Sequence, residues 1–247
     1  MKTWHWQAFL VLLLVALSTV LYLAHYAVFR DAHHIWLYLL GDIAFLPLEV
    51  LLVVLVLHRL LDLREKRSMF KKLNMVIGAF FSEVGTQLLG RFRRFDARAG
   101  ELAAGLADMD EWSKADFARA AARLETREPV IAVQPGDLVE LRDFLAARRD
   151  FLLRLLENPN LLEHEKFTEL LWAVFHLTEE LVCRRDLAHV AQADLEHLAG
   201  DARRAQKLLL SQWLHYMRHL RDDYPYLFSL AVRTNPFDPE AAVEITE

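Results

Sequence analysis

Hydrophobic residues form two long stretches near the N-terminus and afterwards recur at helical spacing. The stretches cover about residues 7–29 and 35–58, and each is long enough to supply the roughly 20 apolar residues that cross a hydrocarbon core. We therefore predict two membrane-spanning helices. The residues between them, Arg30 to His34, leave room only for a tight turn, so residues 1–60 are predicted to form a transmembrane hairpin.

After the hairpin, the chain continues with a charged segment and then with amphipathic sequence. In residues 61–95 a basic segment precedes the apolar run Leu73 to Leu89, which carries too many polar residues to insert by itself. We predict a juxtamembrane amphipathic helix that is either buried against protein or lies at the membrane interface. Residues 96–235 show a helical period and predict a cytoplasmic antiparallel helical bundle. Residues 236–247 form an acidic tail. The predicted fold is thus an all-α membrane protein, a two-span hairpin followed by a helical bundle.

Start and stop signals divide the first half of the bundle. Asp110 is the predicted N-cap of a helix over residues 113–125, and Asp137 is the predicted start of a helix that ends near Asn158-Pro159. Between these helices, residues 127–136, REPVIAVQPG, predict a linker or a docked extended segment.

The second half is predicted to contain two longer helices. The first begins at Asn160 and runs to about Arg185, and the second runs from about Leu187 to Asp222, with a kink or break at Gly200-Asp201. The single cysteine, Cys183, has apolar neighbours that indicate a buried thiol, and it excludes an internal disulfide.

Charge and composition narrow the class of partner. The formal net charge of −5 provides no general basic field for nucleic acid, and 54% hydrophobic residues fit a membrane part joined to a soluble part. Membrane lipids, further copies of the chain and a cytoplasmic protein are the partners that remain. Basic residues directly after the second stretch predict that both termini lie in the cytoplasm at the inner membrane and that this region contacts lipid head groups. These residues are Arg59, Arg64, Lys66, Arg67, Lys71 and Lys72.

Two carboxylates lie inside the second membrane stretch. Asp42 and Glu49 are seven residues apart, which places them on one helix face about 10 Å apart along the axis. A charge in mid-membrane costs about 2.5–3.5 kcal/mol on insertion scales, so these groups require partners. Pro47 lies between them and removes a backbone donor, which predicts a helix kink.

The first membrane stretch has a matching polar face formed by Ser18, Tyr22 and His25. Counted at about 1.5 Å per residue from the turn, Tyr22 reaches the depth of Asp42, so the two faces can meet. Together with Asp42 and Glu49 these residues make up a polar seam. One interpretation is an ion or proton pathway in an oligomer, and the other is that the carboxylates are protonated or hydrogen-bonded and fix helix pairing.

Histidines in the bundle suggest a second kind of site. His215 and His219 are one helical turn apart, and Asp-x-x-His recurs with His189 and His197. The pattern resembles the carboxylate-and-histidine sites of di-metal helical bundles. It departs from them because its acids are aspartates and both pairs lie on one predicted helix. Exposed surface histidines are the alternative interpretation, and no cofactor other than such a metal ion is indicated.

The motifs for common catalytic chemistry are absent, including phosphate-binding glycine loops and nucleophile elbows. Two hypotheses follow. The first is a non-enzymatic, self-associating membrane protein in which the seam mediates assembly and ion passage. The second is a cytoplasmic helical binding module, metal-binding through its histidines, for which the spans are only an anchor. Replacing the spans by a foreign anchor separates the two.

Overall fold

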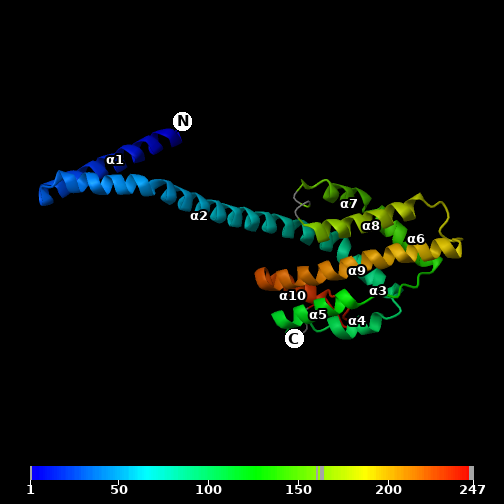
Figure 1. Cartoon of the computed structure of the whole chain (residues 1–247). Helices are drawn as coiled ribbons and strands as arrows, with labels where there is room; N and C mark the ends of the chain where they lie inside the picture. Colours follow the sequence, from blue (N-terminus) through cyan, green and yellow to red (C-terminus); the bar gives the residue numbers. More distant parts are fainter. Residues whose placement is uncertain (1, 160, 162–163, 245–247) are drawn as a thin grey trace. The chain divides into compact units, whose positions relative to one another are not determined.

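The computed structural model describes residues 2–159, 161 and 164–244, except for the side chains of residues 2–5 and 65–72. The chain divides into two compact units, Met1–Lys66 and Arg67–Glu247. The described residues outside the connecting segments are helical, and their only strand-like pairing is one isolated antiparallel bridge, Asp96 with Ile131 (Figure 1). The all-helical prediction is confirmed.

The first unit contains α1 (Lys2–Phe29) and the first part of α2 (Ala32–Phe80). The turn is shorter than predicted because Asp31 already caps α2: its Oδ1 accepts hydrogen bonds from the backbone N–H groups of His33 and His34 at 2.9 and 3.2 Å. Arg30 takes the left-handed conformation, with φ of 50°, to reverse the chain. By length and composition, residues Trp6–Phe29 and Ala32–Arg64 could each cross a membrane.

Residues 61–95 do not form a separate helix. The helix α2 continues to Phe80, is followed by a π-helical turn η1 (Phe81–Gly85), and leads into α3 (Thr86–Phe95). Apolar residues of this segment, among them Leu73, Phe80, Val84 and Phe92, are buried in the second unit. Of the two predicted locations for the amphipathic face, the one observed is against protein.

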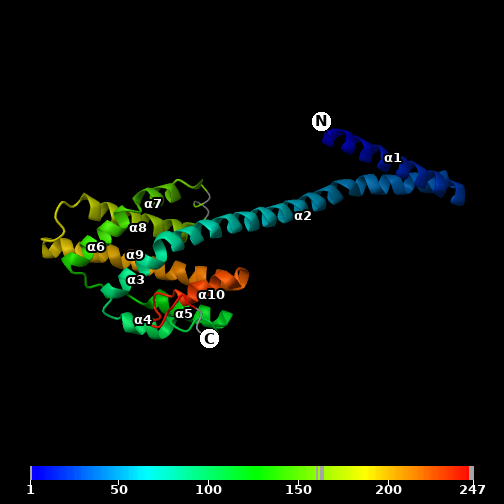
Figure 2. The ribbon, with the colours of Figure 1, turned by 180° about the vertical axis from the view of Figure 1, so that it is seen from behind.

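The second unit contains the remaining helices, and α9 lies at its centre. They are α4 (Ala99–Leu106), α5 (Lys114–Thr126), α6 (Pro135–Ala146), α7 (Arg149–Leu156), α8 (Glu165–Cys183), α9 (Gln192–Asp223) and α10 (Pro225–Arg233). The helices α3, α5, α8 and α10 pack against α9, and α6 and α7 pack against α8. Both views show α8 lying along α9 (Figures 1 and 2).

The helix predicted over residues 113–125 is observed within one residue, but the predicted caps of two helices are wrong by a few residues. Ser113, and not Asp110, caps α5: its hydroxyl accepts from the backbone N–H of Asp116, whose carboxylate accepts from the N–H of Ser113. The helix α6 begins at Pro135, and Asp137 is its third residue, where its carboxylate accepts from the N–H of Gln134 at 2.9 Å. Both helices thus use an acidic residue in the first turn and not at the cap.

Two predicted long elements also differ. The helix expected from Asp137 to Asn158-Pro159 is divided at residues 147–148 into α6 and α7, and the helix expected to break at Gly200-Asp201 is continuous. Leucines recur at helical spacing in both α6 and α7, because each helix buries its apolar face, and so the spacing does not reveal the break between them. Asn160, the other predicted start, lies outside the described residues; α8 begins at Glu165. Cys183 is exposed at the end of α8.

The segment 127–134 is an extended strip docked onto the end of α3. The Ala97 N–H donates to the Val130 carbonyl at 2.9 Å, and the Ala132 N–H donates to the Phe95 carbonyl at 2.8 Å. Ile131 and Val133 are buried. Of the two predicted interpretations, the docked segment is the one observed.

The π-helical turn places Gly85 where a side chain has no room. An added Cβ would lie 2.5 Å from Cδ1 of Phe81 and 2.9 Å from Cε1 of Phe80, and both rings are buried. We therefore expect Gly85→Ala to lower the free energy of unfolding by about 1–3 kcal/mol, the usual cost of overpacking a core. Denaturant unfolding of the detergent-solubilised chain, followed by tryptophan fluorescence, measures this.

Gly90 provides the matched control because it is also helical and an added Cβ would meet nothing within 4 Å. Gly90→Ala is expected to stabilise the protein by about 0.5–1 kcal/mol through helix propensity alone. Equal effects of the two substitutions would contradict the packing account.

Candidate functional site

The hairpin contains a hollow between α1 and α2, with a volume of about 710 Å³. Polar side chains line it from both helices at one-turn intervals, and leucines and Ile35 complete the wall. The polar residues are Ser18, Tyr22 and His25 from α1 and His34, Tyr38 and Asp42 from α2. The predicted polar faces of the two membrane stretches therefore lie around one space, with His34 and Tyr38 added to them.

The two histidines lie near the turn end of this hairpin hollow. The rings of His25 and His34 are parallel to within 9°, with centroids 6.1 Å apart, and the His34 ring meets Tyr38 edge-on at 4.6 Å. His25 Nδ1 is buried and has no hydrogen-bond partner among the described residues. Imidazole, phenol and carboxylate groups together offer both donors and acceptors. The hollow can therefore receive polar groups from a further molecule.

The part of the polar seam farthest from the turn does not line the hairpin hollow. Glu49 is exposed on α2 and is not a lining residue. Pro47 lies inside α2, which is helical on both sides of it, so the carbonyl one turn earlier lacks its usual donor. Glu49 is thus a carboxylate within an apolar helix that the single hairpin leaves exposed.

The basic residues after the second stretch are only partly described. Arg59 and Arg64 are exposed on α2 and make no ion pair with described residues, which suits contact with lipid head groups. The side chains of Lys66, Arg67, Lys71 and Lys72 lie outside the described residues.

The four histidines predicted to bind metal do not come together. His189 pairs with Asp186 at the surface, at 2.9 Å, as the Asp-x-x-His spacing suggested. His215 contacts the Ser211 carbonyl of its own helix at 2.7 Å, and His219 pairs with Asp223 at 2.8 Å. The predicted set is therefore dispersed, and only His197 meets several possible ligands.

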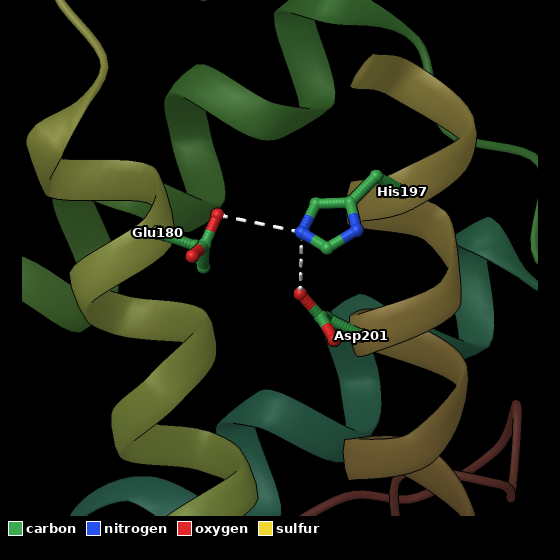
Figure 3. A group of neighbouring side chains, drawn as sticks. All are labelled: Glu180, His197 and Asp201. Carbon is green, nitrogen blue, oxygen red and sulfur yellow. Dashed lines mark ion pairs between the residues drawn. The ribbon is translucent and has the colours of Figure 1, made fainter. Parts of the chain in front are cut away.

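His197 belongs to a cluster that the sequence interpretation missed. It faces Glu180 of α8 and Asp201 of its own helix (Figure 3), and His176 of α8 also contacts Asp201. We refer to His176, Glu180, His197 and Asp201 as the α8–α9 cluster. A signal was present in the sequence: His-x-x-x-Glu at 176–180 and His-x-x-x-Asp at 197–201 each place two ligands one turn apart.

Comparison with known proteins identifies matching helical domains. Residues 69–233 match the family described as "Uncharacterized protein MJ1433, C-terminal helical domain", and residues 1–61 match "MJ1433, N-terminal helical domain". A relative from Methanocaldococcus jannaschii, described as "Uncharacterized protein MJ1433", is 44% identical over 230 residues, which cover 93% of this chain and 92% of the relative. No solved structure matches the chain.

Proposed function

Since the chain belongs to the family of the uncharacterized protein MJ1433, whose descriptions name helical domains and no activity, we propose a function from the geometry of the hairpin. The protein self-associates in the membrane, and the polar seam holds copies of the hairpin together. The observation that supports this is the hairpin hollow, where polar groups of both apolar helices surround a space that one hairpin does not fill.

The bilayer makes an unfilled polar hollow unfavourable. Within hydrocarbon there is no water to satisfy the Asp42 carboxyl or His25 Nδ1, and polar membrane residues turn toward one another or toward a protein interior. The hairpin provides little interior of its own, because none of the most apolar part of α1 or α2 is buried. A second copy presents the same donors and acceptors, and a symmetric assembly also gives Glu49 a partner.

The orientation of the assembly is part of the proposal. Basic residues cluster after the second apolar helix, and lysine and arginine beside a membrane span mark the cytoplasmic side. Two spans then return the chain to its starting side, so both termini are placed in the cytoplasm at the inner membrane. Labelling of single cysteines in a Cys183→Ser background, at residue 3 and residue 31, tests this orientation with a membrane-impermeant reagent.

Mass measurement of the complex in nanodiscs tests the association. We expect a closed oligomer for the native chain and a smaller species for the double variant Asp42→Ala/Glu49→Ala, which removes both polar groups. Polar contacts between membrane helices contribute about 0.6–1.7 kcal/mol each, so two lost contacts weaken assembly by about 1–3 kcal/mol per protomer. Asp62→Ala, a change of the same kind on the same helix beyond the seam, is the matched control. A monomer for the native chain would refute the proposal.

Ion or proton passage is the next step of the same proposal, because a ring of carboxylates around an assembly axis is a cation pathway. Dye-reported proton flux into vesicles, compared between the native chain and Asp42→Asn, tests it. The competing function is a tethered helical module, and it is favoured by the separate core of the second unit. If a foreign two-span anchor preserves the native oligomer mass, association belongs to the helical module and the seam has only a structural role.

A further inference from the structure

Asp201 is a buried carboxylate with one oxygen unsatisfied. Its side chain is 6% exposed, and Oδ2 has no hydrogen-bond partner among the described residues. Leaving a buried carboxylate oxygen without a hydrogen bond costs more than the about 1–3 kcal/mol of a neutral group. The histidines in ion-pair contact with this oxygen do not hydrogen-bond to it, an arrangement that a bound cation would satisfy.

Two histidine nitrogens lie near Asp201 Oδ2. His197 Nε2 is 3.4 Å from it and 3.5 Å from Glu180 Oε2 (Figure 3). His176 Nε2 is also 3.4 Å from Asp201 Oδ2. These distances exceed the about 2.7–3.2 Å of an N–H···O hydrogen bond. They match the ligand-to-ligand edge, about 3.4 Å, of a tetrahedron whose metal bonds are about 2.1 Å long.

The two packed helices bring the ligands to one point. One turn of α8 separates His176 from Glu180, and one turn of α9 separates His197 from Asp201, so each helix offers a histidine and a carboxylate on the face toward the other. The ligand atoms of Glu180, His197 and Asp201 all lie within 4.8 Å of one another. His176 is not one of these three residues, but its Nε2 lies 3.4 Å from Asp201 Oδ2 and 4.0 Å from Glu180 Oε1.

Arginines contact both carboxylates of the cluster. Arg184 donates to Glu180 Oε2 at 2.7 Å and is itself fixed by a two-point contact with Asp194, at 2.6 and 2.8 Å. Glu180 Oε2 is also the oxygen that lies 3.5 Å from His197 Nε2, so Arg184 orients the oxygen that faces the cluster, as outer-shell groups orient the ligands of metal sites. Arg204 lies 3.8 Å from Asp201 Oδ1, and Asp201 Oδ2 faces the histidines.

We propose that the α8–α9 cluster binds one divalent first-row transition-metal ion, with Glu180, His197 and Asp201 as ligands and His176 beside them. One imidazole and two carboxylates form a nitrogen and oxygen donor set that suits zinc or ferrous iron better than calcium, which prefers oxygen alone, and such a three-residue set leaves a fourth position for water. The two histidine side chains are 48% and 53% exposed, so the ion has a path of entry from solvent.

Metal titration of the full chain in detergent, after removal of bound metal by a chelator, tests the proposal. We expect Zn²⁺ to bind at one equivalent by calorimetry, and Co²⁺ to give the intense visible absorption of a four-coordinate site. Asp201→Asn retains the shape of the side chain and is expected to weaken Zn²⁺ binding by more than the roughly 10–100-fold that loss of an outer-shell partner costs. His189→Gln and His215→Gln are the matched controls, because these histidines lie outside the cluster.

The outcomes separate the metal site from a network of ion pairs. Saturation at one equivalent that is lost in Asp201→Asn and retained in both controls supports the site. Absence of saturable binding, or equal loss in His189→Gln, would overturn it. If Asp201→Asn does not fold, as judged by circular dichroism, substitution of the half-exposed ligand His197 by glutamine replaces it with the same expectation. The outcome of the metal titration does not depend on the mass of the oligomer. Failure of the metal-site proposal therefore leaves the self-association proposal intact, and the reverse also holds.

Discussion

A chain that begins at residue 96 is expected to remain unfolded, whereas a chain that begins at residue 67 is expected to fold as a water-soluble helical domain. The difference is the segment that contains the end of α2, η1 and α3. It supplies nine apolar residues of the buried core of the second unit, and each is at most 6% exposed. They are Leu73, Ile77, Phe80, Phe81, Val84, Leu88, Leu89, Phe92 and Phe95.

The energetic comparison is one-sided. Burial of one large apolar side chain contributes about 1.5–3 kcal/mol, and the net stability of a domain is only about 5–15 kcal/mol. Removal of the whole segment therefore costs more free energy of folding than the remaining helices can supply. Circular dichroism and thermal unfolding of the two fragments, 67–247 and 96–247, measure the result. A cooperative unfolding transition for the shorter fragment would show that residues 73–95 only cover a core that is complete without them.

This boundary also shows what the sequence could and could not predict. The apolar period in Leu73 to Leu89 correctly indicated a helix with a buried face. Its partner could not be inferred, because a basic segment and an apolar face favour the membrane interface as strongly as a protein core. The continuity of α2 from Ala32 to Phe80 was likewise hidden, since backbone hydrogen bonding continues through a change from apolar to charged residues.

The polar seam was easier to predict because one short turn fixes the register of the hairpin. Counting residues from Arg30 placed Tyr22 level with Asp42, and both line the hairpin hollow. His34 and Tyr38 were missed although they lie one and two turns before Asp42 on the same face of α2. His34 was predicted to lie in the turn, and Tyr38 is an aromatic residue inside the second apolar stretch, so neither was predicted to belong to the seam.

The α8–α9 cluster could not be predicted from residue spacing alone. Spacing within one helix reveals pairs such as His197 and Asp201, but many helices carry such pairs on solvated faces. Whether His176 and Glu180 meet them depends on the packing of α8 on α9, which the apolar residues determine. Asp201 was interpreted as part of a helix break with Gly200. The buried residues Leu198 and Ala202 on either side keep the helix intact.

Substitution of Asp96 by alanine is expected to destabilise the second unit by about 3–5 kcal/mol, the cost of removing one partner of a buried ion pair. The Asp96 side chain is completely buried and accepts from Arg127 Nη2 at 2.6 Å and from Gln206 Nε2 at 3.1 Å. It also accepts from the backbone N–H groups of Arg98 and Val130. One carboxylate thus joins the end of α3, the docked segment and α9.

The destabilisation arises from what remains after the substitution. The Arg127 side chain is only 12% exposed, and Asp96 is its sole carboxylate partner among the described residues, so Asp96→Ala leaves a buried guanidinium without a counter-charge. For a domain of this size the expected loss lowers the midpoint of thermal unfolding by roughly 6–20 °C. Asp143→Ala is the matched control, because Asp143 is 64% exposed and its pair with Arg142 contributes at most about 1 kcal/mol.

A double variant distinguishes the buried charge from loss of the backbone contacts. Asp96→Ala/Arg127→Met removes both charges and replaces the guanidinium by an apolar side chain, so it is expected to be more stable than Asp96→Ala alone. If the double variant is no more stable than the single one, the hydrogen bonds to Arg98, Val130 and Gln206 account for the stabilisation. The ion pair would then be incidental, and the docking of residues 127–134 on α3 would depend on a carboxylate acting only as a hydrogen-bond acceptor.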